Sequence, residues 1–129
     1  AQINQFAVNM LAHLDIEFTA VGSDFVTAKM PVDKRTQQPM GLLHGGASVV
    51  LAESLGSVAG QLCVQKGQYC VGLEINANHL KSVREGYVFG TARPIHVGKR
   101  THVWEIKIVD EANNLVCISR ITLAVIDKK

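Results

Sequence analysis

The spacing of apolar residues changes from helical to alternating near residue 16. Over residues 2–14, apolar side chains recur every three or four positions, which predicts one short amphipathic helix. From residue 16 the interval shortens to two, and polar residues at 22–24 divide the alternation into two segments. The pattern therefore predicts a β-hairpin made of residues 16–20 and 26–32.

A long apolar helix is predicted in the middle of the chain. Pro31 is expected to end strand pairing, and the polar run of residues 33–38 is expected to form a loop. The helix that follows has an apolar stripe, formed by Ala47, Leu51, Leu55, Val58, Ala59 and Leu62. Its other side carries small residues and one charge, at Gly46, Glu53, Gly56, Ser57 and Gly60. Glycines are unfavourable inside helices, so we expect another backbone or a ligand to approach this side closely. We expect a second subunit to pack against it.

Four further strands follow the helix. Apolar and polar residues alternate in four segments separated by turn-forming residues, and these segments lie at 71–81, from 88 onward, at 102–109 and at 115–126. Strands joined by short turns pair antiparallel. We therefore predict an α+β fold in which an antiparallel β-sheet wraps around the long central α-helix, as a single domain over residues 1–129.

Composition narrows the class of protein. The chain has 129 residues, of which 47% are hydrophobic and 19% charged, and its net charge of +2 is too small to argue for nucleic-acid binding. No run is long and apolar enough for a membrane span, and the start of the sequence lacks the pattern of a secretory signal, so we expect a cytoplasmic protein. Cys63, Cys70 and Cys117 form no C-x-x-C pair and are expected to be small core residues without disulfides or zinc.

The loop before the central helix carries a specific motif. Residues 38–47 read QPMGLLHGGA, Glu53 and Ser57 follow on the helix, and residues 72–79 read GLEINANH. Together these segments resemble the hotdog-fold acyl-CoA thioesterases, in the branch that contains 1,4-dihydroxy-2-naphthoyl-CoA hydrolases and related aryl-CoA and aryl-carrier-protein thioesterases. The resemblance covers residues 14–126. It implies a homodimer whose sheets join edge to edge with active sites at the subunit boundary, and commonly a homotetramer.

A thioester hydrolase needs a carboxylate and a donor for the oxyanion. Glu53 is the carboxylate of the central helix, and the resemblance implies that it is the nucleophile or general base. The alternative is a structural Glu held by polar groups of a partner subunit. The backbone N–H of Gly45 is expected to point out of the helix start, where negative charge is favoured. In the family this position polarises the thioester carbonyl, although Gly45 and Gly46 also permit a tight turn.

Three further residues are candidates for the catalytic centre. Gln38 and His44 resemble the pair that orients the substrate near the thioester in the family, while a lone His before a helix is also a common structural residue. Ser57 lies one turn after Glu53 and is expected to hold the attacking water or to orient the carboxylate. We find no Ser-His-Asp arrangement.

Coenzyme A carries phosphates, so basic residues are expected near the mouth of the site. We predict that His79, Lys81 and Arg84 contact the nucleotide, with simple solvation as the alternative. Lys99 and Arg100 lie at the far end of the next strand, so one subunit is not expected to place both clusters on one phosphate group.

No metal is predicted, because His96 and His102 lack a third ligand. No cofactor is predicted other than the coenzyme A of the substrate. An acyl carrier protein is the second candidate carrier of the acyl group. Two other functions stay open. One is a non-catalytic acyl-CoA binding protein, and the other is a hotdog-fold hydratase or dehydratase, which usually uses a His in a different motif.

Overall fold

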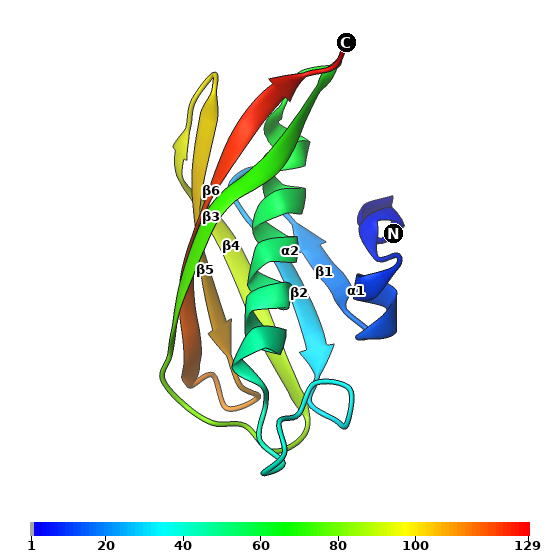
Figure 1. The fold of residues 1–129 in the computed structure, drawn as a ribbon, viewed down its shortest axis with the longest axis vertical. Coiled ribbons are helices and arrows are strands. Elements are labelled where there is room, and N and C mark those ends of the chain that lie inside the picture. Colours follow the sequence, from blue (N-terminus) through cyan, green and yellow to red (C-terminus); the bar gives the residue numbers. More distant parts are fainter. Residues whose placement is uncertain (1) are drawn as a thin grey trace.

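The computed structural model describes residues 2–129. Its helices and strands follow one another as η1 (Gln2–Phe6), α1 (Met10–His13), β1 (Glu17–Val21), β2 (Val26–Pro31), α2 (Gly45–Cys63), β3 (Gln68–His79), β4 (Tyr87–Val97), β5 (Thr101–Val109) and β6 (Leu115–Asp127). The strands form one antiparallel sheet in the order β1-β2-β4-β5-β6-β3. Figure 1 shows that the curved sheet wraps around α2, which confirms the predicted α+β architecture.

Helix α2 packs on the sheet through its predicted apolar stripe. Leu51, Leu55 and Ala59 are fully buried, and of the six predicted members only Leu62 is largely exposed, at 47%. The helix begins where His44, in an extended conformation, accepts a hydrogen bond from the Gly46 N–H through Nδ1. A side-chain acceptor at this position satisfies one of the donors that a helix start leaves free.

The small residues of α2 do not all face away from the sheet, which corrects the sequence interpretation. Gly56 and Gly60 are buried, and a Cβ at these positions would collide with Ile121 and Leu123 of β6. The close approach that these glycines permit is therefore to the chain's own sheet. Gly46 and Glu53 are exposed, as the sequence predicts for the opposite side.

Strand β3 lies at the edge of the sheet and contains a β-bulge at Leu73. Its pairing with β6 shifts between Gly72 and Glu74, so the residues that face α2 change from even to odd numbers. Before the bulge Gly72 faces the helix, and after it His79 does. The simple alternation predicted for this strand is therefore wrong across residue 73. Val71 and Leu73 are exposed, at 41% and 61%.

The predicted N-terminal helix is interrupted. Residues Gln2–Phe6 form a 3₁₀-helix and Met10–His13 a single α-helical turn, because Asn9 between them has a positive φ of 56°. Ile3, Phe6 and Leu11 still pack on the core, as expected, whereas Met10 is 60% exposed.

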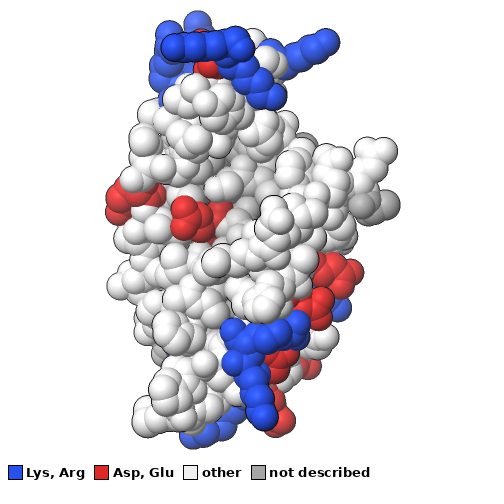
Figure 2. Space-filling view, turned by 45° about the vertical axis from the view of Figure 1, so that its right-hand side comes forward, with Lys and Arg blue, Asp and Glu red and all other residues white. Residues whose placement is uncertain are grey.

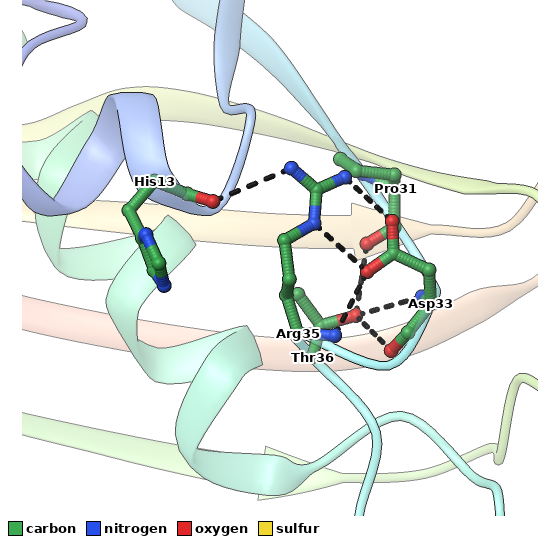
Figure 3. A network of polar contacts seen from close by, with 5 residues as sticks. All are labelled: His13, Pro31, Asp33, Arg35 and Thr36. Carbon is green, nitrogen blue, oxygen red and sulfur yellow. Dashed lines mark hydrogen bonds and ion pairs between the residues drawn. The ribbon is translucent and has the colours of Figure 1, made fainter.

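Polar contacts fix the loop that leads from β2 to α2 (Figure 3). The Arg35 guanidinium donates to both carboxylate oxygens of Asp33 and to the His13 carbonyl, and the side-chain hydrogen bond from Arg35 lowers the pKa of Asp33. Thr36 is buried, and its hydroxyl donates to the Pro31 carbonyl at 2.9 Å. This network holds the start of the 37–44 segment, which carries the candidate site residues.

Candidate active site

A groove of about 420 Å³ opens beside the N-terminal end of α2. It brings together four of the predicted site residues, Gln38, Gly45, His79 and Lys81. Three segments far apart in sequence build it: the loop together with the first turn of α2, the chain leaving β3, and the start of β6. The other lining residues are Leu42, Leu43, Ser48, Leu80, Ser82 and Val116.

Gly45 supplies a free backbone donor to this groove. It is the first residue of α2, and within residues 2–129 its N–H has no backbone or side-chain acceptor. A Cβ at residue 45 would stand 3.0 Å from Nε2 of His79, so the imidazole lies directly beside the helix start. A helix N-terminus favours negative charge, and the arrangement therefore suits an oxygen that becomes an anion.

Gln38 is held by its own loop. Its backbone N–H donates to the Leu42 carbonyl at 2.8 Å, and its side-chain oxygen accepts from the backbone N–H groups of Met40 and Leu42. Gly41, with φ of 81°, closes this turn. The side-chain NH₂ of Gln38 is left as the group that can donate to a bound molecule.

Ser48 is a groove residue that the sequence interpretation missed. It is 1% exposed and lies three residues after Gly45, on the same side of the first helical turns. That spacing was the available signal, because a residue at i+3 shares a face with the residue at the helix start.

His44 lies outside the groove. Besides capping α2, its ring lines a separate cavity of about 390 Å³ with His13, Gly46 and Val50. Because Nδ1 accepts the Gly46 N–H at 2.8 Å, the neutral ring carries its proton on Nε2.

Glu53 also lies outside the groove. Glu53 lies eight positions after Gly45 along α2, which corresponds to about 12 Å of helix. Its carboxylate has no hydrogen bond or ion pair within the described chain, residues 2–129, and lies against Gly72 of β3. Ser57 follows one turn later and is half-buried, with no hydrogen bond to Glu53. Within one chain, therefore, Glu53 and the Gly45 N–H cannot reach the same carbonyl group.

The basic residues near the groove differ in their availability. Nζ of Lys81 lies 2.6 Å from Oδ2 of Asp110, and this hydrogen bond lowers the pKa of Asp110 from 3.8 to about 2. Arg84 contributes its backbone carbonyl to Gln37 at 2.8 Å, and its side chain lines a neighbouring hollow of about 290 Å³ that Lys81 shares. Arg84 has no ion pair among residues 2–129, so its guanidinium is free to meet an anion.

Within residues 2–129, no three His, Cys, Asp or Glu side chains gather in an arrangement that could hold a metal ion. The helices formed by these residues are all too short or too polar to cross a membrane.

The sheet that wraps around one long helix, with a helix N-terminus opening into a groove, defines the hotdog fold. The model of the thioesterase superfamily matches residues 40–117. The chain belongs to this family of thioester hydrolases, which confirms the fold and the enzyme class predicted from the sequence.

Individual relatives agree with this assignment. The chain is 59% identical to the 1,4-dihydroxy-2-naphthoyl-CoA hydrolase of Escherichia coli over 92% of its own length and 87% of that protein. It is 51% identical to the proofreading thioesterase EntH of Cronobacter turicensis, over 90% of its length and 85% of the relative. The crystal structure of a thioesterase from Haemophilus influenzae superposes with a TM-score of 0.94 at 53% identity, covering 97% of this chain and 88% of that one.

Proposed function

We propose that this protein is an acyl-CoA thioesterase that hydrolyses the thioester of an aromatic or similarly bulky acid to the free acid and coenzyme A. The observation that supports this most directly is the free Gly45 N–H at the wall of the groove. A single preorganised donor of this kind lowers the barrier by about 3 kcal/mol. The name of the 1,4-dihydroxy-2-naphthoyl-CoA hydrolase relative favours a bulky aromatic acid on coenzyme A.

We infer that Glu53 acts from a second copy of the chain. The helix rise separates Glu53 from Gly45, while the edge strand β3 offers twelve residues for pairing, with exposed apolar side chains at Tyr69, Val71 and Leu73. Two identical edge strands related by a two-fold axis pair antiparallel. A two-fold axis at Asn76 places the bulge near Gly72 of one copy opposite His79 of the other copy. Glu53, which lies beside Gly72 in the first copy, is then level with the Gly45 N–H of the other copy.

In this dimer the chemistry follows from the two groups. The carbonyl oxygen of the thioester accepts from the Gly45 N–H, which stabilises the oxyanion as the tetrahedral intermediate forms. Glu53 of the second copy either attacks the carbonyl carbon, forming a mixed anhydride that water then hydrolyses, or removes a proton from the attacking water. In both routes the tetrahedral intermediate collapses by breaking the C–S bond, and coenzyme A leaves as a thiolate that takes up a proton. The Gln38 amide and His79 then lie where they can position the thioester, and Ser57 adjoins Glu53 on the other wall.

The dimer is also the proposed unit of a homotetramer. The outer face of β4 exposes Tyr87 and Phe89, each at 37%, so a second apolar surface remains after the β3 edges pair. We infer that the protein works in the cytoplasm, which the three free thiols Cys63, Cys70 and Cys117 support.

One experiment tests the proposed function. Hydrolysis is measured across aryl, short-chain and long-chain acyl-CoA and carrier-protein thioesters, with the parent, Glu53→Gln and Glu17→Gln. Glu17 is an exposed carboxylate of β1, at the opposite edge of the sheet from β3, and serves as the matched control. Glu53→Gln should lose activity by a factor of about 10² to 10⁴ with KM little changed, and Glu17→Gln should match the parent.

Two results would count against the proposal. An active Glu53→Gln variant removes Glu53 from the chemistry. A parent protein that binds acyl-CoA yet hydrolyses no member of the panel is a binding protein instead.

A further inference from the structure

A second cavity, of about 580 Å³, opens at the opposite end of α2 from the groove. It lies where α2 ends, where β4 turns into β5 and where β6 ends. Figure 2 shows Lys and Arg side chains gathered at this end of the molecule, at the top of the view. The polar and basic residues that line it include Gln68, Lys99, Arg100, His102 and Asp127.

His102 forms part of the wall of this cavity although it is only 1% exposed. Its Nδ1 accepts a hydrogen bond from Nε1 of Trp104 at 3.4 Å, so the proton of the neutral ring is on Nε2. Burial lowers the pKa of His102, with the nearby His96 acting in the same direction, and this favours the neutral ring.

Nε2 of His102 retains accessible surface in a residue that lines the cavity. Among residues 2–129, every fully buried side-chain nitrogen or oxygen has a hydrogen-bond partner. Nε2 has no such partner in this part of the chain, so it is not fully buried, and the cavity is the space that His102 lines. An N–H donor on a buried, well-packed side chain is therefore accessible where His102 lines the cavity.

The charges around the cavity are mainly positive. Lys99 and Arg100 form no ion pair within residues 2–129, in contrast to Lys81, which is neutralised by Asp110. Asp127 is the acidic residue of the lining, and its carboxylate accepts from Nε2 of Gln68 at 3.1 Å. A buried N–H donor with a guanidinium and an ammonium beside it suits a multiply charged oxyanion.

We propose that this cavity binds phosphate groups, with the Nε2–H of His102 donating from the wall and Lys99 and Arg100 neutralising the charge. The phosphates have two possible sources, which are free phosphate and the nucleotide of coenzyme A. The second source rests on the proposed function. In the antiparallel dimer proposed above, α2 of one copy extends about 15 Å past the Gly45 of the other, so the cavity of one copy lies beyond the groove of the other.

Trp104 provides a direct readout, because it is the single tryptophan of the chain and contacts His102. Inorganic pyrophosphate is titrated into the protein while Trp104 fluorescence is followed. The parent should show a saturable change. The double variant Lys99→Ala/Arg100→Ala should bind about tenfold more weakly or worse. The control is Lys66→Ala/Lys128→Ala, which removes the same charge from the same end at residues that do not line the cavity, and it should bind as the parent does.

Three results would overturn the site. The parent shows no saturable change, or both double variants weaken binding equally, or Lys99→Ala/Arg100→Ala lowers only the melting temperature with pyrophosphate binding unchanged. The last result would mean that these cations merely stabilise the C-terminal end of α2.

Hydrolysis of an acyl-CoA and of the matching acyl-pantetheine distinguishes the two possible sources of the phosphate groups. If the nucleotide of coenzyme A is the ligand, Lys99→Ala/Arg100→Ala lowers kcat/KM for an acyl-CoA about tenfold and leaves the matching acyl-pantetheine unchanged. If free phosphate is the ligand, both substrates are hydrolysed as by the parent while pyrophosphate binding is still weakened. A parent that hydrolyses neither substrate removes the proposed function alone, because the pyrophosphate titration still decides the phosphate site.

Discussion

The carboxylate of Glu53 lies against the backbone of Gly72, so that a Cβ at residue 72 would stand 3.2 Å from Oε2. A contact of this length is tighter than ordinary van der Waals packing, and a methyl group there would displace the carboxylate by a few tenths of an ångström. The absence of a side chain at residue 72 therefore leaves the space in which the proposed catalytic carboxylate lies, although the two residues belong to different elements.

Replacing Gly72 by Ala should slow hydrolysis without unfolding the protein. A misplacement of about 1 Å costs about 10² in rate, so a displacement of a few tenths of an ångström should lower kcat by a factor of about 2 to 10 with KM little changed. Steady-state kinetics measures the effect, and a thermal melt checks the fold. Val21→Ala, at an exposed position of β1 on the opposite edge of the sheet, is the control. A fully active Gly72→Ala variant would show that Glu53 does not need this contact.

The two-fold axis proposed at Asn76 can be tested by cross-linking. A residue on the axis lies opposite its own copy, at the short Cα separation that a disulfide requires. Asn76→Cys should therefore form a covalent dimer under mild oxidation. Asn78→Cys has the same exposure and faces the same side of β3, but its copy lies several residues away, and it should stay uncross-linked. The parent, which has three free thiols, sets the background on a non-reducing gel.

The sequence predicted which elements form better than which side each residue faces. The six strands and the long helix follow from hydrophobic period and turn residues, which are local signals. The bulge at Leu73 is not local, because it exists only in the register between β3 and β6. The sides faced by Gly56 and Gly60 also depend on long-range contacts. A helical wheel places both glycines opposite the apolar stripe, whereas in the structure they contact Ile121 and Leu123 of β6.

The candidate site was predicted in part for a similar reason. Gly45, Gln38 and His79 meet at the groove because the loop, the helix start and the end of β3 converge there. The resemblance to thioesterases named Glu53 as well, yet within one chain the helix holds it about 12 Å from Gly45. A single sequence carries no direct signal of which subunit supplies a residue, and only the geometry of α2 raises that question.

Asp110→Asn should change how stability depends on pH. The hydrogen bond from Lys81 holds the pKa of Asp110 at about 2, below its usual 3.8. Ionised Asp110 therefore stabilises the folded state above pH 3.8, and this contribution is lost as the pH falls toward about 2. Denaturant unfolding across that range should give a steeper loss for the parent than for the variant. Parallel curves for the two proteins would mean that the Lys81–Asp110 pair does not contribute to stability.

Substitutions of His44 can distinguish a structural role of this residue from a catalytic one. Its Nδ1 caps α2 through the Gly46 N–H, and its ring lies outside the groove. His44→Ala should lower the free energy of unfolding by about 1 kcal/mol, as the loss of a helix cap does, and should slow hydrolysis because the capped turn positions Gly45. His44→Asn places another side-chain acceptor at the cap and should restore both quantities. If His44→Asn regains stability in denaturant unfolding but not kcat/KM, the imidazole itself acts on the substrate.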